Sequence, residues 1–301
     1  MTRAAHRGAA RHTEAGLVAL AALVVITLVA GLALADGASV GADPVPGLGP
    51  QGRRPQFKVE CPYSHSANDD PIVYPGEPGA SHLHDFFGSE IVDADTVPAD
   101  LLGSPTTCQQ QLDTASYWAP ALLDHGAKVE PVDLIAYYRP SVGTDPSTLV
   151  PYPHGLVMIA GDGTATEPQP LSVAAWHCGS SPELSSEPPT CPRTAPLAVR
   201  IAFPSCWDGV NLDSEDHKQH LAYAVGGTCP PQHPVAVPEL VVEVRYPIHG
   251  DGHDLVLASG QTITAHADFM NGWDQDKLER EVRTCLSRGR ICGVVSNRAI
   301  G

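Results

Sequence analysis

Histidines and carboxylates gather in four short segments of this chain. The segments span residues 61–76, 79–88, 206–220 and 266–274. The chain has 14 histidines in 301 residues, and all but His6 and His12 follow residue 35. Imidazoles and carboxylates bind transition metals and transfer protons, so the four segments are candidates for one shared polar site.

The spacing within the segments suggests how their side chains would converge. His82 and His84 alternate, which places both on the same side of an extended strand. His266 and Asp268 alternate in the same way, whereas His217 and His220 would share one face of a helical turn. Two imidazoles on one face can bind a single metal ion, and a nearby carboxylate can be a third ligand or orient a ring.

We therefore predict a site for a divalent transition metal, Zn, Cu or Mn. The predicted ligands are His82, His84, His217, His220 and His266. Asp216 and Asp268 are predicted as general acid/base or ligand-orienting groups. Residues predicted to contact a substrate are His65, Asp70, Trp207, Asn271 and Asp274. The alternative for each isolated histidine is a hydrogen-bonded structural role. The sequence contains no GxSxG, P-loop or HExxH motif.

The N-terminus has the features of an export segment. Arg3, Arg7 and Arg11 precede twenty uncharged, mostly apolar residues, 16–35. The small residues before Asp36 fit a signal peptide cleaved after residue 35, but twenty apolar residues are also long enough to remain as a membrane anchor. Both alternatives place residues 36–301 outside the cytoplasm, secreted or anchored to the cell membrane. The only membrane contact expected is through 16–35, if they are uncleaved.

Cysteine usage agrees with export. All eight cysteines follow the apolar run, and an even number in an exported chain predicts disulfides. The sequence contains no CxxC pair, which argues against a thiolate zinc site. Our hypothesis is that neighbours in the sequence pair: Cys61 with Cys108, Cys178 with Cys191, Cys206 with Cys229, and Cys285 with Cys292.

The strong acidity of the chain restricts its partners. Its net charge is −16, and beyond residue 35 there are 15 basic against 33 acidic residues, a net of −18. Such a surface repels nucleic acid and anionic lipid, so we expect neither as a partner.

The remaining sequence predicts one domain made mostly of β-structure. Pro/Gly-rich residues 36–56 read as a linker, 57–292 as the domain and 293–301 as a tail. Short apolar segments bounded by turn residues predict strands at 134–139, 156–160, 173–178, 199–203, 240–246, 255–258 and 262–269. Helices are predicted at 113–123 and 273–286. We expect a sandwich or jelly-roll-like domain with long loops and a C-terminal helix.

Several stretches resemble the DUF1996 family of exported proteins. They are DPIVYPG at 70–76, SHLH at 81–84, YWAP at 117–120, YYR at 137–139, PSCWDGVNLDS at 204–214, DHKQH at 216–220, CPPQHP at 229–234 and HADFMNGWD at 266–274. The resemblance covers about residues 57–286 and implies a single exported domain, with the His/Asp segments as a unit. It supplies no catalytic residues. Fungal members often carry an Arg before the DPI stretch, where this chain has Asn68 and Asp69.

The function expected from these observations is that of an exported enzyme acting on an extracellular polymer or glycan. One alternative is a non-catalytic module that binds the cell envelope or has a structural role. Another is a metal-binding protein without turnover. An enzyme requires the segments to converge in one pocket, whereas a scaffold role predicts dispersed, hydrogen-bonded side chains.

Overall fold

The computed structural model describes residues 54–295 and residue 297. The predicted export segment, residues 1–35, and the linker up to residue 53 lie outside the described residues. The strands are β1 (Gln56–Ala67), β2 (His84–Gly88), β3 (Ser116–Pro120), β4 (Leu122–Asp124), β5 (Ala127–Lys128), β6 (Asp133–Arg139), β7 (Val157–Gly161), β8 (Ala174–Cys178), β9 (Leu197–Ala202), β10 (Cys206–Trp207), β11 (Leu221–Ala222), β12 (Val235–Ala236), β13 (Glu239–Tyr246), β14 (Leu255–Leu257), β15 (His266–Met270) and β16 (Ile291–Val294). The helices are α1 (Pro98–Leu101) and α2 (Gln275–Glu281), with 3₁₀ turns at Pro146–Thr148 and Thr262–Thr264 and a π-helical turn at Val282–Leu286.

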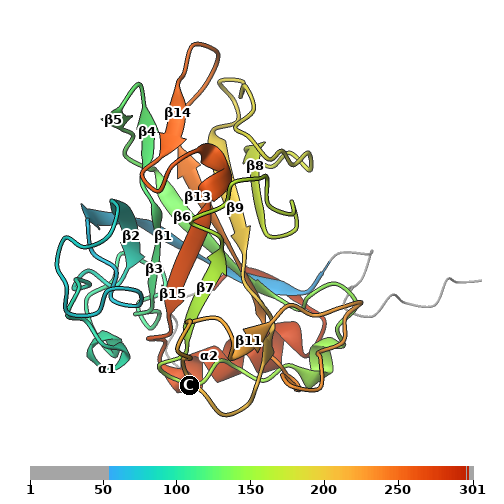
Figure 1. The fold of residues 1–301 in the computed structure, drawn as a ribbon. Helices are drawn as coiled ribbons and strands as arrows, with labels where there is room; N and C mark the ends of the chain where they lie inside the picture. The colour runs from blue at the N-terminus through green and yellow to red at the C-terminus, as the bar shows by residue number, and fades with distance from the viewer. Residues whose placement is uncertain (1–53, 296, 298–301) are drawn as a thin grey trace, which may run out of the picture. The chain divides into compact units, whose positions relative to one another are not determined.

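One large sheet organises the domain (Figure 1). Its strand order is β7-β15-β3-β2-β1-β6-β13-β9-β8, with β16 beside β1. Neighbours are antiparallel except for β1 and β16, and the sheet curls into a nearly closed, barrel-like shape. Strand β1 joins the two halves, because residues 57–62 pair with β6 and residues 63–67 pair with β2. The mainly β fold with a C-terminal helix is therefore confirmed.

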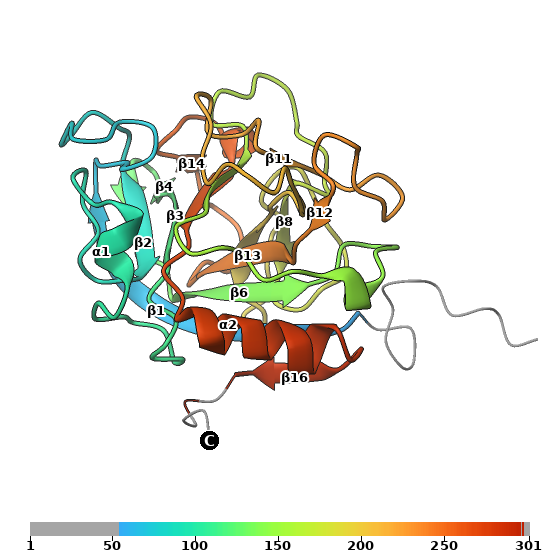
Figure 2. The ribbon, with the colours of Figure 1, turned by 90° about the horizontal axis from the view of Figure 1, so that it is seen from below.

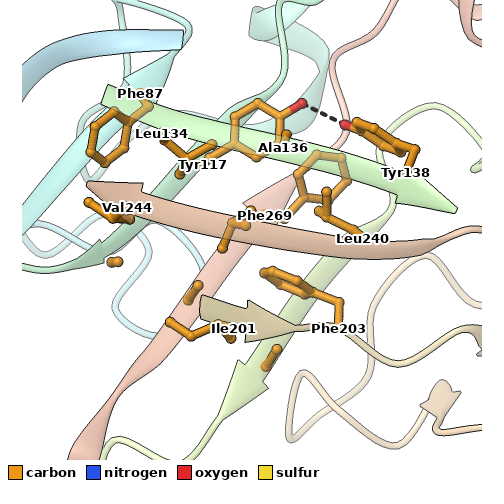
Figure 3. Packing of buried hydrophobic residues seen from close by; sticks show 14 of the residues in the cluster. Phe87, Tyr117, Leu134, Ala136, Tyr138, Ile201, Phe203, Leu240, Val244 and Phe269 are labelled. Carbon is orange, nitrogen blue, oxygen red and sulfur yellow. Dashed lines mark hydrogen bonds between the residues drawn. The ribbon is translucent and has the colours of Figure 1, made fainter. Parts of the chain in front are cut away.

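The main core fills the space between the two halves of the sheet (Figure 3). The ring of Phe269 from β15 packs 5.1 Å from Tyr117 of β3 and 6.4 Å from Phe203. A polar chain runs through this core from Trp273 Nε1 to the Tyr138 hydroxyl at 3.0 Å, then to the Tyr117 hydroxyl at 2.5 Å. Tyr117 donates in turn to Asp113 at 2.8 Å. The polar side-chain groups of these four residues are thus hydrogen-bonded to one another within the apolar core.

A second, smaller apolar cluster covers the outer face of β2, β3 and β15. Its members are Ile72, Phe86, Val92, Leu101, Trp118, Val157 and Met270. Three of them come from the segments before and after β2, so these segments form a cover over that face. As a result β2, β3 and β15 are buried on both faces, and all five residues of each strand are buried.

This double burial explains the one predicted helix that is wrong. Residues 113–123 form β3 and the start of β4, not a helix. A strand that is buried on both faces lacks the alternation of apolar and polar residues that identifies strands from sequence. Strand β1 is the longest strand that the sequence did not predict, because its polar residues and Pro62 obscure its pattern. The sequence-based assignment also omitted β2 and the short strands β4, β5, β10, β11, β12 and β16.

The C-terminal helix and the disulfides are as predicted. Helix α2 and the π turn cover 275–286, and Leu278, Val282, Cys285 and Leu286 are all buried. Figure 2 shows α2 lying along β1, with β16 beyond it. Strand β16 extends to Val294, slightly past the predicted end of the domain. All four sequential disulfides form: Cys61–Cys108, Cys178–Cys191, Cys206–Cys229 and Cys285–Cys292. Across residues 54–295 and 297, we find no helix with the length and apolarity to cross a bilayer.

Candidate metal centre

Three imidazole rings meet on the covered outer face of the sheet. His84 begins β2, His266 begins β15, and His82 lies two residues before β2. Strand β3 separates β2 from β15, and its Pro120 pairs with His84, so a compact ring lies between the two histidines. The ring centroids are 4.2 Å apart for His82 and His84, 5.1 Å for His82 and His266, and 5.8 Å for His84 and His266. One nitrogen from each ring lies within 4.8 Å of the others.

The backbone fixes which nitrogen two of these rings present. His84 Nδ1 lies 3.1 Å from the carbonyl oxygen of Asp69, and His266 Nδ1 lies 2.9 Å from that of Thr264. A carbonyl only accepts hydrogen bonds, so each Nδ1 carries the proton and each Nε2 has a free lone pair. The Nε2 atoms of His82 and His84 are buried and have no hydrogen-bond partner. This is the arrangement by which carbonyl groups orient histidine ligands toward a metal.

Two buried carboxylates extend the cluster around His84. One oxygen each from Asp70 and Asp268 lies within 4.8 Å of a His84 nitrogen and of the other. Asp268 follows His266 on the same face of β15, and its Oδ2 is buried without a partner. Asp70 Oδ1 accepts from the backbone N–H groups of Ile72 and Val73, both at 3.0 Å. The cluster therefore offers three imidazole nitrogens and two carboxylates at one place.

Burial shifts the pKa of each of these groups toward its uncharged form. Desolvation lowers the pKa of His82, lowers that of His84 well below its usual range, and lowers that of His266 to about 4. Desolvation also raises the pKa of Asp70, and raises that of Asp268 well above its usual range. Neutral imidazoles are ready to donate lone pairs to a metal, and a bound cation would favour the ionised form of both carboxyls.

Two glycines, one at the end of β7 and one just after it, leave room for the His266 side chain. Gly161 pairs with His266 across β7 and β15 at a positive φ of 82°, and an added Cβ would meet the His266 backbone at 2.9 Å. A Cβ at Gly163 would come 2.9 Å from Cε1 of the His266 ring. The ring thus packs directly against glycine backbone, which limits how it can tilt.

The family assignment covers all five residues of the cluster. Residues 70–273 match DUF1996, described as a domain of unknown function. The chain belongs to the DUF1996 family. No curated protein and no solved structure matches it.

The DUF1996 domain does not bring the third predicted segment into the cluster. Both ring nitrogens of His220 are occupied, Nδ1 by Ser214 Oγ at 3.0 Å and Nε2 by the Val157 carbonyl oxygen at 2.7 Å. His217 Nδ1 bonds to the Asp213 carboxylate at 2.9 Å, and among the described residues it belongs to no group with metal-ligand spacing. These two histidines hold their own loop together instead, and only the electrostatic effect of His217 reaches Asp70.

The other predicted site residues also have structural partners. Both nitrogens of His65 are bonded, to Ser64 Oγ and to the Val92 carbonyl, and its ring stacks on Phe86. Trp207 donates to the Asn211 carbonyl, and Asn271 donates to the Pro153 carbonyl. The carboxylate of Asp274 caps α2 by accepting from Lys277 N. The carboxylate of Asp216 caps a turn by accepting from Lys218 N and Gln219 N. Those backbone bonds lower the pKa of the exposed Asp216 to about 2, which does not suit a general acid.

Sequence reasoning missed some contributions to the cluster. Asp70 was expected to contact a substrate, yet it lies with the histidines. Gly161 and Gly163 form a GDG turn, but no pattern in the sequence shows that this turn would lie against His266. A further group with metal-ligand spacing, Cys61, Cys108 and Asp113, is unsuitable because its two sulfurs form a disulfide.

An apolar pocket lies further along the same face of β15. It has a volume of about 480 Å³, and Met270, Val157, Ile72 and Leu212 are among the residues that line it. None of the five cluster side chains lines this pocket. Three of the four predicted segments thus contribute to the cluster, but they meet beside the pocket and not inside it.

Proposed function

We propose that this DUF1996 domain binds one divalent transition metal ion through His82, His84 and His266. The observation that carries the proposal is the convergence of three neutral imidazoles, two of which have their Nδ1 protons fixed by backbone carbonyls. Asp70 and Asp268 lie next to the ligands as a further ligand or as groups that adjust the charge of the site. Four disulfides support an extracytoplasmic location. Secretion or anchoring through residues 16–35 is part of the same proposal.

A metal accounts for polar atoms that would otherwise be costly. A buried donor or acceptor without a partner costs on the order of 1–3 kcal/mol, so native proteins contain few of them. His82 Nε2, His84 Nε2 and Asp268 Oδ2 are all of this kind and lie in one place. A bound cation would satisfy the three at once, whereas a hydrogen-bond network that only braces the loops would have paired them.

The ligand set favours zinc or copper over manganese. Imidazole suits Zn and Cu, while sites dominated by carboxylate and water suit Mn. Three histidines are also the ligand set of zinc enzymes that keep a fourth position open for water or substrate. Action on an extracellular polymer or glycan is the finer part of this proposal. It is supported by the half-exposed His82, through which substrate would reach a metal that kept its fourth position open.

Metal content tests the proposal directly. The purified protein is loaded separately with Zn²⁺, Cu²⁺ or Mn²⁺, dialysed, and measured by elemental mass spectrometry. We expect about one equivalent of the preferred ion in the wild type and little in His84→Ala, since losing a ligand removes most of the affinity. The matched control is His125→Asn, because His125 is exposed at a φ of 49° that asparagine tolerates.

The third segment provides a second control. His217→Ala should keep the metal, because His217 bonds to Asp213 and lies outside the cluster. Equal metal in the wild type and in His84→Ala, or none in either, would contradict the proposal. Loss of metal in His217→Ala but not in His84→Ala would move the site to the third segment.

A further inference from the structure

A lysine and an aspartate contact each other at the edge of the main core. Asp85 lies on β2 between Phe86, which faces the outer cluster, and His84, so its own side chain is on the core face. Its carboxyl oxygen Oδ1 lies 3.1 Å from Nζ of Lys128, the last residue of β5. The side chain of Asp85 is 1% exposed and that of Lys128 is 27% exposed. The carboxyl is therefore shielded from water, and the lysine reaches it from the surface.

Two hydroxyl groups close a ring of hydrogen bonds around this pair. Lys128 Nζ donates to the Tyr63 hydroxyl at 3.3 Å, and that hydroxyl lies 2.7 Å from Ser66 Oγ. Ser66 is paired with Asp85 across β1 and β2, and its Oγ donates to Asp85 Oδ1 at 2.5 Å. Nζ also lies 4.5 Å from the centre of the Tyr63 ring. These contacts hold the amine against the carboxyl and give a proton a route from one to the other.

The second carboxyl oxygen of Asp85 has no partner. Oδ2 is buried and makes no hydrogen bond. Burial raises the pKa of Asp85, and burial also opposes the charge of Lys128, although the neighbouring carboxylate raises the pKa of that lysine overall. An ordinary ion pair therefore leaves a charged, water-shielded carboxylate with one oxygen unsatisfied, which is unfavourable.

We propose that Lys128 and Asp85 join in an intramolecular amide, an isopeptide bond between β5 and β2. The bond from Nζ to Cγ of the aspartate forms, and the bond from Cγ to Oδ2 breaks. Two protons of the ammonium pass to Oδ2, which leaves as water, so both charges disappear and no oxidant or other reactant is consumed. Oδ1 keeps its hydrogen bond from Ser66, and the amide N–H keeps the Tyr63 hydroxyl as its acceptor. The oxygen that leaves is the one that has no partner.

Two other lysines of the described residues pair with a carboxylate but lack this arrangement. Lys58 lies 2.7 Å from Glu60, and both side chains are partly exposed, at 25% and 23%. Lys277 lies 2.7 Å from Glu281 on α2, and neither carboxyl oxygen of Glu281 is buried without a partner. Both of these carboxylates can remain ionised, so both pairs should stay unlinked. They are internal controls for the pair at Lys128.

The amide would be a cross-link of a different kind from the four disulfides. Reducing agents do not cleave it, and it does not depend on the metal centre. It would tie β5, which belongs to the small sheet with β4 and β14, to the large sheet through β2. Like a disulfide, it would stabilise the domain by restricting the unfolded chain.

Mass spectrometry of the folded protein tests the proposal. The full chain is produced in a secreting host, its disulfides are reduced and alkylated, and it is digested with trypsin. Trypsin cleaves an unlinked chain after Lys128, whereas an amide at Nζ prevents that cut. We expect a peptide that continues through Lys128, lacks the mass of one water molecule, and yields fragments in which Lys128 is joined to Asp85. Cleavage after Lys58 and Lys277 should be complete.

The matched variant is Lys128→Arg, which keeps the positive charge beside Asp85 but cannot form the amide. Its peptides should all have the masses of the unmodified sequence, and its melting temperature should be lower than that of the wild type. Circular dichroism shows whether both proteins are folded. Complete cleavage after Lys128 in the folded wild type, with no loss of water, would overturn the proposal. A loss of water that persists in Lys128→Arg would place the modification elsewhere and overturn it as well.

Discussion

His84 connects the two parts of the candidate site. A ring nitrogen of His84 belongs both to the histidine triad and to the group with Asp70 and Asp268. Since its Nδ1 is held by the Asp69 carbonyl, Nε2 is the nitrogen left for a metal in either group. One lone pair cannot serve two ions, so the five side chains describe a single site with His84 at its centre. The alternation of His82 with His84 and of His266 with Asp268 predicted these side chains from sequence, because alternation on strands fixes which face they share.

Other residues could not be assigned from spacing alone. His217 and His220 also have ligand spacing, but their nitrogens bond to Asp213, Ser214 and the Val157 carbonyl. Those partners depend on how the loop lies against β7, which is a tertiary property. Of the five metal ligands predicted from local spacing, three lie together in the structure. The spacing alone could not show that His217 and His220 lie outside this cluster.

Gly163 provides a test of how tightly the His266 ring is positioned. In Gly163→Ala the new methyl would meet the ring at 2.9 Å, so the ring must tilt away from its present orientation. We expect metal affinity to fall about tenfold or more, the usual effect of disturbing the groups that orient a ligand. Competition with a chelator of known affinity measures the change.

The control for that experiment lies in the same turn. Thr164→Ala removes a hydroxyl that bonds to Asp162 without placing an atom against His266. It should bind metal as the wild type does. Unchanged affinity in Gly163→Ala, with the fold intact, would mean that the ring has room to tilt without losing the ion.

At the scale of elements, burial on both faces limited what the sequence could predict for β3. Strands β6, β8, β9 and β13 were located from their apolar runs and turn residues, and α2 from its helical periodicity. Strand β3 was mistaken for a helix because the outer cover buries its second face. That cover is formed by segments distant in sequence, and a local pattern does not contain it. The same cover makes the outer face dry enough to hold neutral histidines.

The disulfides should stabilise the domain according to the loops that they close. Cys61–Cys108 spans 47 residues and Cys285–Cys292 spans 7. By chain entropy alone, the first stabilises by about 4 kcal/mol and the second by about 2.5 kcal/mol. We expect the double Cys→Ala variant of the longer loop to lose more stability in urea unfolding. The reverse order would show that native-state packing outweighs the effect on the unfolded chain.

At the scale of the whole molecule, the buried histidines link stability to pH. Neutral His266 has a pKa of about 4 in the folded protein, whereas an exposed imidazole in the unfolded chain titrates near 6.5. As pH falls from about 6.5 to about 4, the unfolded chain gains a proton there that the folded protein does not. The metal-free protein should therefore lose stability from this residue, on the order of 3 kcal/mol across that window.

The raised pKa values of Asp113 and Asp268 act in the opposite direction, so a difference between variants is the informative quantity. The unfolding free energies of the metal-free wild type and His266→Gln are compared at several pH values. The stability of the wild type relative to the variant should decline on acidification from pH 6.5 to 4. A difference independent of pH would show that His266 is not buried in its neutral form.

The pairing of β1 with β16 has a mechanical consequence. The two strands run parallel, with Gln56 opposite Ile291 and Lys58 opposite Val294. A force that pulls the N-terminal end of β1 away from the C-terminal end of β16 would slide the two strands past each other along their length. The hydrogen bonds between them would then bear the load together, and not one at a time as in unzipping. Strand β6 holds the other edge of β1 over residues 57–62, so sliding must break that ladder as well. Tension between the two ends of the domain therefore loads β1, the strand that joins both halves of the sheet, in shear.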